Sequence, residues 1–399
     1  MARTRKALPA KIDVAHLISA GVLASVCPRA LIEEVLAETG KASQRERLLP
    51  APAVVYYVMA LALWREAPLE EVLRVVCEGL QWLGGGETDG VQASKSAISQ
   101  ARTRLGAQVM RALAERVLRP LAAVGAPGAW YRGYRVMALD GSCLDVADEA
   151  ANAAYFGTSG AARGQSAFPQ MRVLGLVECG THVVTAAAAA PYKQSEQALA
   201  AQLLPAKLQS DMLVLADRNF YGFKLWRLAA ATGAKLAWRV KAPLKLPIEH
   251  ALPDGSYLST VFDSEDRQHR AGQRVRVIEY TLQGAATPTA ERYRLLTNLL
   301  DPEGAPAQEL AALYHERWEI EGVFDELKTH LRANSTVLRS KTPELVLQEL
   351  WGLLLAHFAI RQLMAHAAWP RGLDPDRLSF THAVRVIKRK MPQAAAIPP

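Results

Sequence analysis

The sequence predicts an α/β protein with a helical segment before its core and further helices after it. Residues 12–83 repeat apolar side chains at helical spacing. From residues 134–240, short apolar runs typical of strands alternate with helix-like runs. Residues 243–290 are rich in Pro and Gly turns and contain short β-like runs. Together these patterns predict an α/β core that is interrupted by a β-rich insertion and flanked by helices.

Four helices are expected in the N-terminal segment, at residues 12–24, 29–38, 52–64 and 69–83. Pro or Gly signals separate them, as is typical of helix boundaries. The stretch GGGETDG that follows has no strand before it and no Gly-Lys pair after it. We therefore interpret it as a linker and not as a phosphate-binding loop.

The segment at residues 93–106 carries basic side chains that two interpretations explain. With Ser94 or Ser96 as its cap, it resembles the second helix of a helix-turn-helix, whose early residues reach DNA. Arg102 and Arg104 would then contact phosphates. Alternatively, the segment is a basic helix that packs through its apolar side and leaves its charges in water. The sequence leaves both interpretations open.

The middle of the chain is expected to alternate between strands and helices. The strands are expected at residues 134–139, 171–179, 182–189, 211–216 and 235–240, and the helices at 194–204 and 220–231. The run DMLVLA in the fourth strand is continuously apolar, which is typical of a strand buried on both faces. A further strand at 292–298 is expected after the insertion.

These elements predict five stretches of the chain. They are a helical N-terminal domain at 1–110, a first part of the core at 130–242, the insertion with a return strand at 243–298, a core helix at 299–345, and C-terminal helices with a tail at 346–399.

The charge balance indicates a polyanionic partner. Lys and Arg total 47 against 39 Asp and Glu, which gives a net charge of +8 at pH 7. The basic residues cluster at 41–47, 102–119, 239–245 and 385–390. Clustering of this kind favours nucleic acid as the partner more than the total alone does.

The cysteines and the apolar runs indicate a cytoplasmic protein. The four cysteines lie far apart without a C-x-x-C pair, which argues against a zinc site or a disulfide framework. The apolar run at 51–64 is too short to span a bilayer, and the run at 345–369 is interrupted by polar residues. We interpret both runs as core helices.

Four polar residues share one face of a helix expected near the end of the chain: Tyr314, Arg317, Glu321 and Lys328. Their spacings of 3, 4 and 7 place them within roughly 60° of arc at about 100° per residue. An apolar stripe borders this face, whereas a solvated polar face usually lies opposite the core. The arrangement suits a carboxylate held at the edge of a pocket between two cations and a phenol.

Two aspartates upstream share a local setting. Asp140 and Asp217 each follow an apolar strand, and each is expected to begin a turn. Carboxylates at strand ends of an α/β sheet point into the crevice where ligands bind. With Glu321 they would form a cluster of three acids, whose mutual repulsion divalent cations with oxygen ligands relieve. Two such ions about 4 Å apart can activate an attacking water and stabilise the leaving oxygen of a phosphodiester.

These residues resemble the signature of the DDE transposases of the insertion-sequence-4 family. That family shows Y-(2)-R-(3)-E-(6)-K, and the four residues of the polar face fit it at every spacing. The segments ALDGSCLDVAD and ADRNFY around the two aspartates also resemble those of the family, as does NAAYFG at residues 152–157. The resemblance extends over residues 15–365 and implies an RNase H-like core with a β-rich insertion.

The resemblance also implies the site and its cofactor. Asp140, Asp217 and Glu321 would bind two Mg²⁺, which Mn²⁺ can replace, and would catalyse metal-dependent cleavage of DNA. Arg317 and Lys328, with Tyr314, would contact phosphates at the transposon end.

Three more residues are candidates for contacts with the DNA backbone. Arg218 lies beside the second acid, and Arg239 and Lys241 follow a core strand, where ordinary solubility charge is the alternative interpretation. The resemblance implies that the N-terminal domain helps to recognise the element's ends. The expected activity is a cut-and-paste transposition in which a freed 3′-hydroxyl attacks target DNA. The expected partners are double-stranded transposon ends and target DNA, bound by a homodimer in a synaptic complex. The expected location is the bacterial cytoplasm, in association with the nucleoid.

Two rival functions remain at this point. The first is an RNase H-like nuclease that cuts DNA without joining it. The second is a non-catalytic DNA-binding protein derived from a transposase. The intact acids at 140, 217 and 321 argue against the second.

Overall fold

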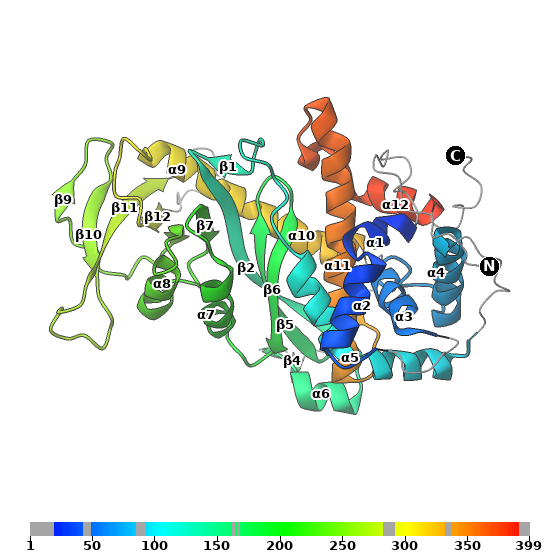
Figure 1. The fold of residues 1–399 in the computed structure, drawn as a ribbon. Coiled ribbons are helices and arrows are strands. Elements are labelled where there is room, and N and C mark those ends of the chain that lie inside the picture. Colours follow the sequence, from blue (N-terminus) through cyan, green and yellow to red (C-terminus); the bar gives the residue numbers. More distant parts are fainter. Residues whose placement is uncertain are drawn as a thin grey trace. The chain divides into compact units, whose positions relative to one another are not determined.

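The structure is a computed structural model that describes residues 20–42, 49–84, 93–161, 164–165, 168–281, 292–331 and 337–390. The chain divides into two compact units. The helical unit comprises Met1–Leu118, Val146–Asn152 and Asp325–Pro399, and the sheet unit comprises Arg119–Asp145 and Ala153–Phe324. The labelled elements of both are shown in Figure 1.

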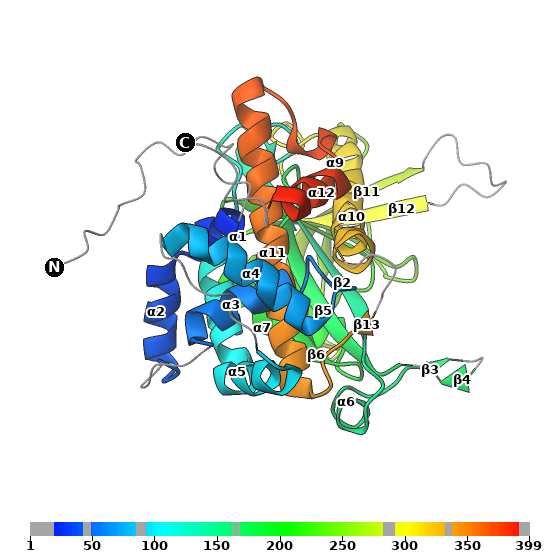
Figure 2. The same ribbon diagram turned by 90° about the vertical axis from the view of Figure 1, so that its right-hand side faces the viewer.

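The helical unit combines helices from both ends of the chain. Its helices are α1 (Ala20–Val26), α2 (Arg29–Glu38), α3 (Ala51–Ala60), α4 (Leu69–Gly84), α5 (Lys95–Val117), α11 (Pro343–Ala368) and α12 (Phe380–Lys390). Helix α11 contacts α1, α3 and α5, as Figure 2 shows. A Cβ at Gly352 would lie 2.7 Å from Val58 Cγ1, so glycine lets α11 approach α3 closely. The N-terminal and C-terminal helices, which were expected as separate stretches ending at residue 110 and beginning at residue 346, therefore belong to one unit. Residues 12–19 of the first expected helix lie outside the described residues.

Two buried polar side chains of α11, Glu349 and Gln348, make hydrogen bonds within the helical unit. Glu349, which is 3% exposed, accepts hydrogen bonds from Arg65 Nη1 at 3.1 Å and from the Ser340 N–H at 3.1 Å. Gln348 donates to the carbonyl oxygens of Arg102 and Gly106. Among the described helices, none is long and apolar enough to cross a bilayer.

The sheet unit is built on one mixed sheet. Its strands follow the order β6-β5-β2-β7-β8-β12-β11-β10-β9, with β1 beside β2. Their bounds are β1 (Trp130–Tyr131), β2 (Tyr134–Val146), β5 (Gln170–Glu178), β6 (Val183–Pro191), β7 (Met212–Ala216), β8 (Lys235–Arg239), β9 (His250–Ala251), β10 (Tyr257–Val261), β11 (Gln273–Thr281) and β12 (Arg292–Thr297). Strand β7 runs parallel to β2 and β8, whereas β5 is antiparallel to both β2 and β6. All five residues of β7 are buried, as the apolar run predicted.

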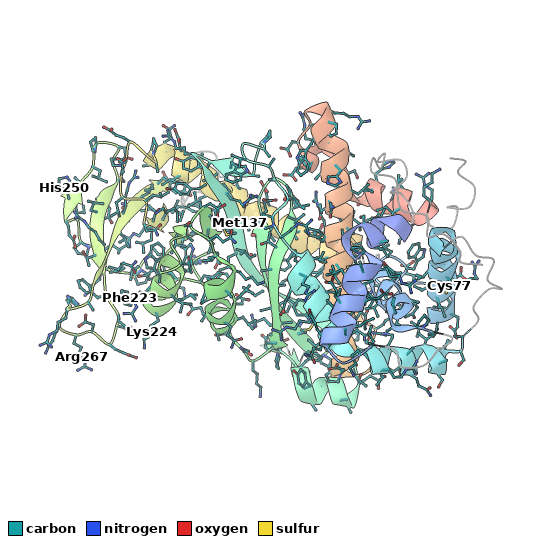
Figure 3. The ribbon with its side chains drawn as sticks, in the orientation of Figure 1. Cys77, Met137, Phe223, Lys224, His250 and Arg267 are labelled. Atoms are coloured by element: carbon teal, nitrogen blue, oxygen red, sulfur yellow. The ribbon has the colours of Figure 1, made fainter. Side chains whose placement is uncertain are left out.

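The helices of the sheet unit cover both faces of this sheet. They are α7 (Glu196–Lys207), α8 (Phe223–Ala230), α9 (Ala307–Tyr314) and α10 (Glu319–Asp325). Between β2 and β5 the chain forms the helix α6 (Ala150–Phe156) and the short strands β3 (Gly160–Ala161) and β4 (Gly164–Gln165). Met137 of β2 lies in an apolar cluster with side chains of α7 and α8, and Phe223 packs against that cluster (Figure 3). These contacts hold α7 and α8 on one face, while α10 lies on the other (Figure 1).

The β-rich insertion continues the same sheet. Strand β12 pairs with β8, with Leu296 opposite Trp238, and β11, β10 and β9 follow outward. The guanidinium of Arg276, fully buried, pairs with Asp254 and donates to the Ala305 carbonyl at 2.6 Å. Asp254 also accepts the Ala307 N–H at 2.8 Å, at the first residue of α9. The insertion therefore fixes where α9 begins.

Gly180, in the turn between β5 and β6, is expected to tolerate alanine poorly. It has φ +78°, and an added Cβ would lie 2.7 Å from the backbone N of Ala129. Gly255 has a similar φ of +82° with no atom within 4 Å of an added Cβ, so it is the matched control. G255A should cost about 1 kcal/mol of unfolding free energy through backbone strain, and G180A about 1–3 kcal/mol more through the clash. Urea unfolding measures both, and equal losses would contradict the clash.

Candidate functional site

The two predicted aspartates lie on neighbouring strands of the sheet unit. In the parallel pair β2 and β7, Leu139 is opposite Ala216, so Asp140 and Asp217 come next on adjacent strands. Adjacent strands lie about 4.8 Å apart, which places the two residues side by side. Asp217 follows the end of β7, as predicted.

The expected turn at Asp140 is wrong. Strand β2 continues to Val146, because residues 140–145 pair with β5, from Asp140 opposite Gly175 to Asp145 opposite Gln170. Asp140 therefore lies within a long strand, at the level where its neighbour β7 stops. On the β5 side Asp140 is paired, whereas on the β7 side its neighbour is the loop that follows Ala216.

The loop after β7 holds the Asp217 carboxylate. The backbone N–H of Asn219 donates to Oδ1 at 2.8 Å, and the Asn219 side chain donates to Oδ2 at 3.2 Å. A side-chain acceptor that bonds the backbone two residues on is typical of Asp in a turn. The carboxylate is thus oriented by its own loop.

The helix that carries Glu321 is not one continuous α-helix. Helix α9 ends at Tyr314, a 3₁₀ turn covers His315–Trp318, α10 covers Glu319–Asp325, and a π-helical turn covers Glu326–His330. The Tyr314 hydroxyl donates to the carbonyl of Ala216 at 3.4 Å, at the last residue of β7. The uneven winding therefore still brings the start of this helical stretch to the end of β7.

Arg317 joins two of the predicted acids. Its Nη1 lies 3.4 Å from Asp140 Oδ2, and its Nη2 lies 3.1 Å from Glu321 Oε1. The Arg317 side chain is 10% exposed, whereas the Glu321 side chain is 46% exposed. A buried guanidinium thus holds a partly exposed carboxylate and a strand carboxylate on the same face of the sheet.

A close approach between α10 and β5 supports this arrangement. A Cβ at Gly175, opposite Asp140, would meet the Phe324 ring at 3.5 Å. Residues directly opposite on paired strands point to the same face, so Asp140 points to the face that α10 covers. Ile320 and Val323, both fully buried, anchor α10 on that face.

The surroundings of Asp140 make its charge costly. Burial raises the pKa of Asp140 to about 6, while the Gly141 N–H at 2.8 Å and the Arg317 charge lower it, and the charges of Asp217 and Glu196 raise it. Burial also raises the pKa of Tyr314 to about 12, so its phenol stays protonated at neutral pH. A site that crowds carboxylates in this way gains from a bound cation.

Three of the predicted DNA-contacting residues are exposed: Arg104 in the helical unit, and Arg218 and Lys241 in the sheet unit. Arg239 is half-buried, with its guanidinium 4.0 Å from the centre of the Tyr293 ring, in a cation–π contact. Lys328 is half-buried and belongs to the helical unit. DNA contact by the three exposed residues remains a prediction.

Arg102 does not fit its expected role. It is 4% exposed and donates to Gln348 Oε1 at 2.9 Å, to Ser340 Oγ at 2.9 Å and to the Leu345 carbonyl. The guanidinium therefore connects α5 to the start of α11, and phosphate contact by Arg102 is corrected to a structural role. Ser94, one of the two cap residues considered, accepts the Ala97 N–H at 3.3 Å.

Comparisons with known proteins agree with the resemblance. Residues 17–115 match the family model "Insertion element 4 transposase N-terminal", and residues 131–359 match "Transposase DDE domain". Transposase InsG for insertion sequence element IS4 of Escherichia coli (strain K12) is 30% identical over 374 residues, covering 90% of this chain and 80% of that protein. Putative transposase InsZ of the same strain is 28% identical over 225 residues, covering 56% of this chain and 72% of that protein.

A solved structure, the cryo-EM structure of a piggyBac transposase synaptic complex with hairpin DNA, is a more distant likeness. It aligns with a TM-score of 0.47 at 11% identity, covering 94% of this chain and 81% of that chain. The family models and the InsG similarity carry the assignment without it. The chain belongs to the insertion-sequence-4 family of DDE transposases.

Proposed function

We propose that this transposase cuts DNA at the ends of its element and joins them to target DNA by a cut-and-paste route. The single observation that carries this proposal is the Arg317 bridge between Asp140 and Glu321, beside the strand end that holds Asp217. The strand order β6-β5-β2-β7-β8 supports an RNase H-like core around these acids. We further propose that the protein acts as a homodimer on two ends, at the bacterial nucleoid.

The three acids fit a divalent-cation site. All their donors are carboxylate oxygens, which Mg²⁺ prefers and which Mn²⁺ also accepts. Burial raises the pKa of Asp140 to about 6, so a bound cation would favour its charged form. When bound, two Mg²⁺ would activate the attacking hydroxyl and stabilise the leaving oxygen.

The other residues of the site would position the acids and the substrate. Arg317 holds Asp140 and Glu321 together and places a buried cation where charge develops on a phosphate. Tyr314 fixes the helix to the end of β7 through the Ala216 carbonyl. Lys328, which follows on the same helical stretch of the chain, is proposed to contact the DNA phosphates.

A strand-transfer assay tests this function against a nuclease that cuts without joining. A labelled oligonucleotide with the element's end is incubated with a supercoiled plasmid and Mg²⁺. The proposed function predicts labelled plasmid that carries the end covalently. Cleaved oligonucleotide without any joined product would favour the nuclease.

Salt dependence tests the exposed cations. Each phosphate contact releases counterions, so R218Q and K241Q should each reduce the slope of log affinity against log salt by about 1. K224Q is the control, because Lys224 (Figure 3) is also exposed in the sheet unit and is not among the predicted DNA contacts. Filter binding to end DNA across a salt series measures the slopes. Unchanged slopes in R218Q and K241Q would remove both residues from the interface.

A further inference from the structure

A fourth carboxylate lies against the Asp140 segment. Helix α7 begins at Glu196, and Ser195 caps it by accepting the Ala198 N–H at 3.2 Å. A Cβ built on Gly141 would lie 2.5 Å from Glu196 Cδ and 2.6 Å from its Oε1. Real Cβ atoms do not approach other atoms this closely, so a larger residue at position 141 would displace the Glu196 carboxylate from its present place.

Gly141 also connects this carboxylate to Asp140. Its N–H donates to Asp140 Oδ1 at 2.8 Å. Successive residues of a strand point to opposite faces, so Glu196 approaches Gly141 from the α7 face, while Asp140 points to the α10 face. Because β7 ends at Ala216, no residue of β7 pairs with β2 at this level. The charges of Asp217 and Glu196 both raise the pKa of Asp140, in addition to the larger effect of burial.

Arg172 holds Glu196 in this position. Its Nη1 donates to Glu196 Oε1 at 2.6 Å, and its Nε and Nη2 donate to the Tyr192 carbonyl at 3.3 and 3.2 Å. The guanidinium also stacks over the Tyr192 ring at 5.1 Å. The two charged side chains are 18% and 24% exposed, so neither sweeps freely through solvent. Arg172 thus holds the Glu196 carboxylate against Gly141, the residue that follows Asp140.

We propose that Glu196 is a fourth acidic ligand of the divalent-cation site, binding together with Asp140 from the α7 side of the sheet. This inference rests on the proposed function, because it assumes that Asp140 binds a cation. Arg172 bonds Oε1 of Glu196, and we place the cation at the other oxygen, Oε2. A purely structural Arg172–Glu196 pair would need neither glycine at 141 nor a place beside Asp140.

Mn²⁺ titration of the full-length protein, followed by the electron paramagnetic resonance signal of free Mn²⁺, tests the inference without measuring activity. E196Q keeps the size of the side chain and an acceptor for Arg172. D140N reports on the proposed site itself. E309Q is the matched control, because Glu309 also pairs with an arginine, Arg132 at 2.8 Å, in the same unit. Circular dichroism and thermal unfolding confirm that each variant is folded.

E196Q and D140N are each expected to weaken Mn²⁺ binding about tenfold or more, and E309Q is expected to leave it unchanged. Wild-type affinity in E196Q with weakened binding in D140N would overturn the role of Glu196 and leave the proposed function standing. Wild-type affinity in both would overturn the cation site at Asp140 as well.

A second variant approaches the same contact from the other side. G141A should weaken Mn²⁺ binding because its methyl group displaces Glu196. If both variants act through this contact, the double variant G141A/E196Q should lose no more affinity than the worse single variant. Fully additive losses would contradict the shared contact.

Discussion

Replacing Glu321 with Gln is expected to reduce strand cleavage by about a thousandfold or more, while binding to end DNA persists. The change removes one charge from the three acids and leaves the side chain's shape. Loss of one preorganised electrostatic group in an active site costs about 10²–10³ in rate, and a weakened cation site adds to this loss. D140N and D217N should behave in the same way. Single-turnover cleavage of labelled end DNA with Mg²⁺ gives the rates, and gel shift gives the affinity.

Asp145 supplies the control for these variants. It lies on β2 as Asp140 does, but it accepts a hydrogen bond from Gln170 Nε2 at 2.9 Å. D145N should therefore keep near wild-type cleavage. Wild-type cleavage by E321Q would remove Glu321 from the site, and a comparable loss in D145N would show that the assay reports general damage to β2.

Replacing Glu349 with Ala is expected to cost the helical unit about 3–5 kcal/mol of unfolding free energy. The carboxylate is buried with the side chain of Arg65, 2% exposed, at 3.1 Å. It also accepts from the Ser340 N–H at 3.1 Å and from the Ser340 hydroxyl at 2.5 Å. Alanine leaves the arginine charge buried without its partner. Urea unfolding at pH 7 measures the loss.

The pH dependence of stability offers a second measure of this pair. Burial by itself would raise the pKa of Glu349, but the charges of Arg65 and Arg102 and the Ser340 hydrogen bond outweigh it and lower the pKa. A carboxyl with a lowered folded-state pKa contributes stability above its unfolded value of about 4.3, and that stability is lost as pH falls through the folded-state pKa. The free energy of unfolding of E349A should therefore fall less than that of the wild type as the pH is lowered.

Glu309 is the control here as well, because its ion pair with Arg132 is 45% and 43% exposed. E309A should leave the free energy of unfolding nearly unchanged, because solvent screens an exposed ion pair. An equally small effect in E349A would mean that water or a rearranged neighbour satisfies Arg65.

Local patterns predicted the elements of the sheet unit better than their ends. The apolar run at residues 211–216 gave β7 to within one residue, because a strand buried on both faces leaves a continuous pattern. The prediction of a turn at Asp140 was wrong, because pairing with β5 extends β2 past a Gly-Ser dipeptide that favours turns. The paired residues lie 25 to 35 positions apart in the sequence, from Asp145 with Gln170 to Asp140 with Gly175. Strand ends depend on such partners, which a single stretch of sequence does not show.

The candidate site divides in the same way. The Tyr314, Arg317 and Glu321 spacing predicted a shared face, and the structure brings Arg317 and Glu321 together even though a 3₁₀ turn replaces the expected α-helix. The burial of Arg102 depends on Gln348, Ser340 and Leu345, distant in sequence, and no local pattern signals it. Glu196 was missed for the same reason, since only the folded chain places it against Gly141.

The continuity of the insertion with the central sheet has a consequence for engineering. Because β12 is hydrogen-bonded along β8, residues 243–298 cannot be excised as a separable module. Their removal would leave β8 as an edge strand with unpaired N–H and C=O groups. Such an edge can pair with a strand of another molecule and so promote aggregation. The removal would also delete Asp254, which accepts the N–H of Ala307 at the start of α9. Helix α9 leads to the turn that carries Arg317, so the position of Arg317 would be held less firmly. Shortened versions of this enzyme should therefore trim only the tip between β10 and β11, where no strand of the core is uncovered.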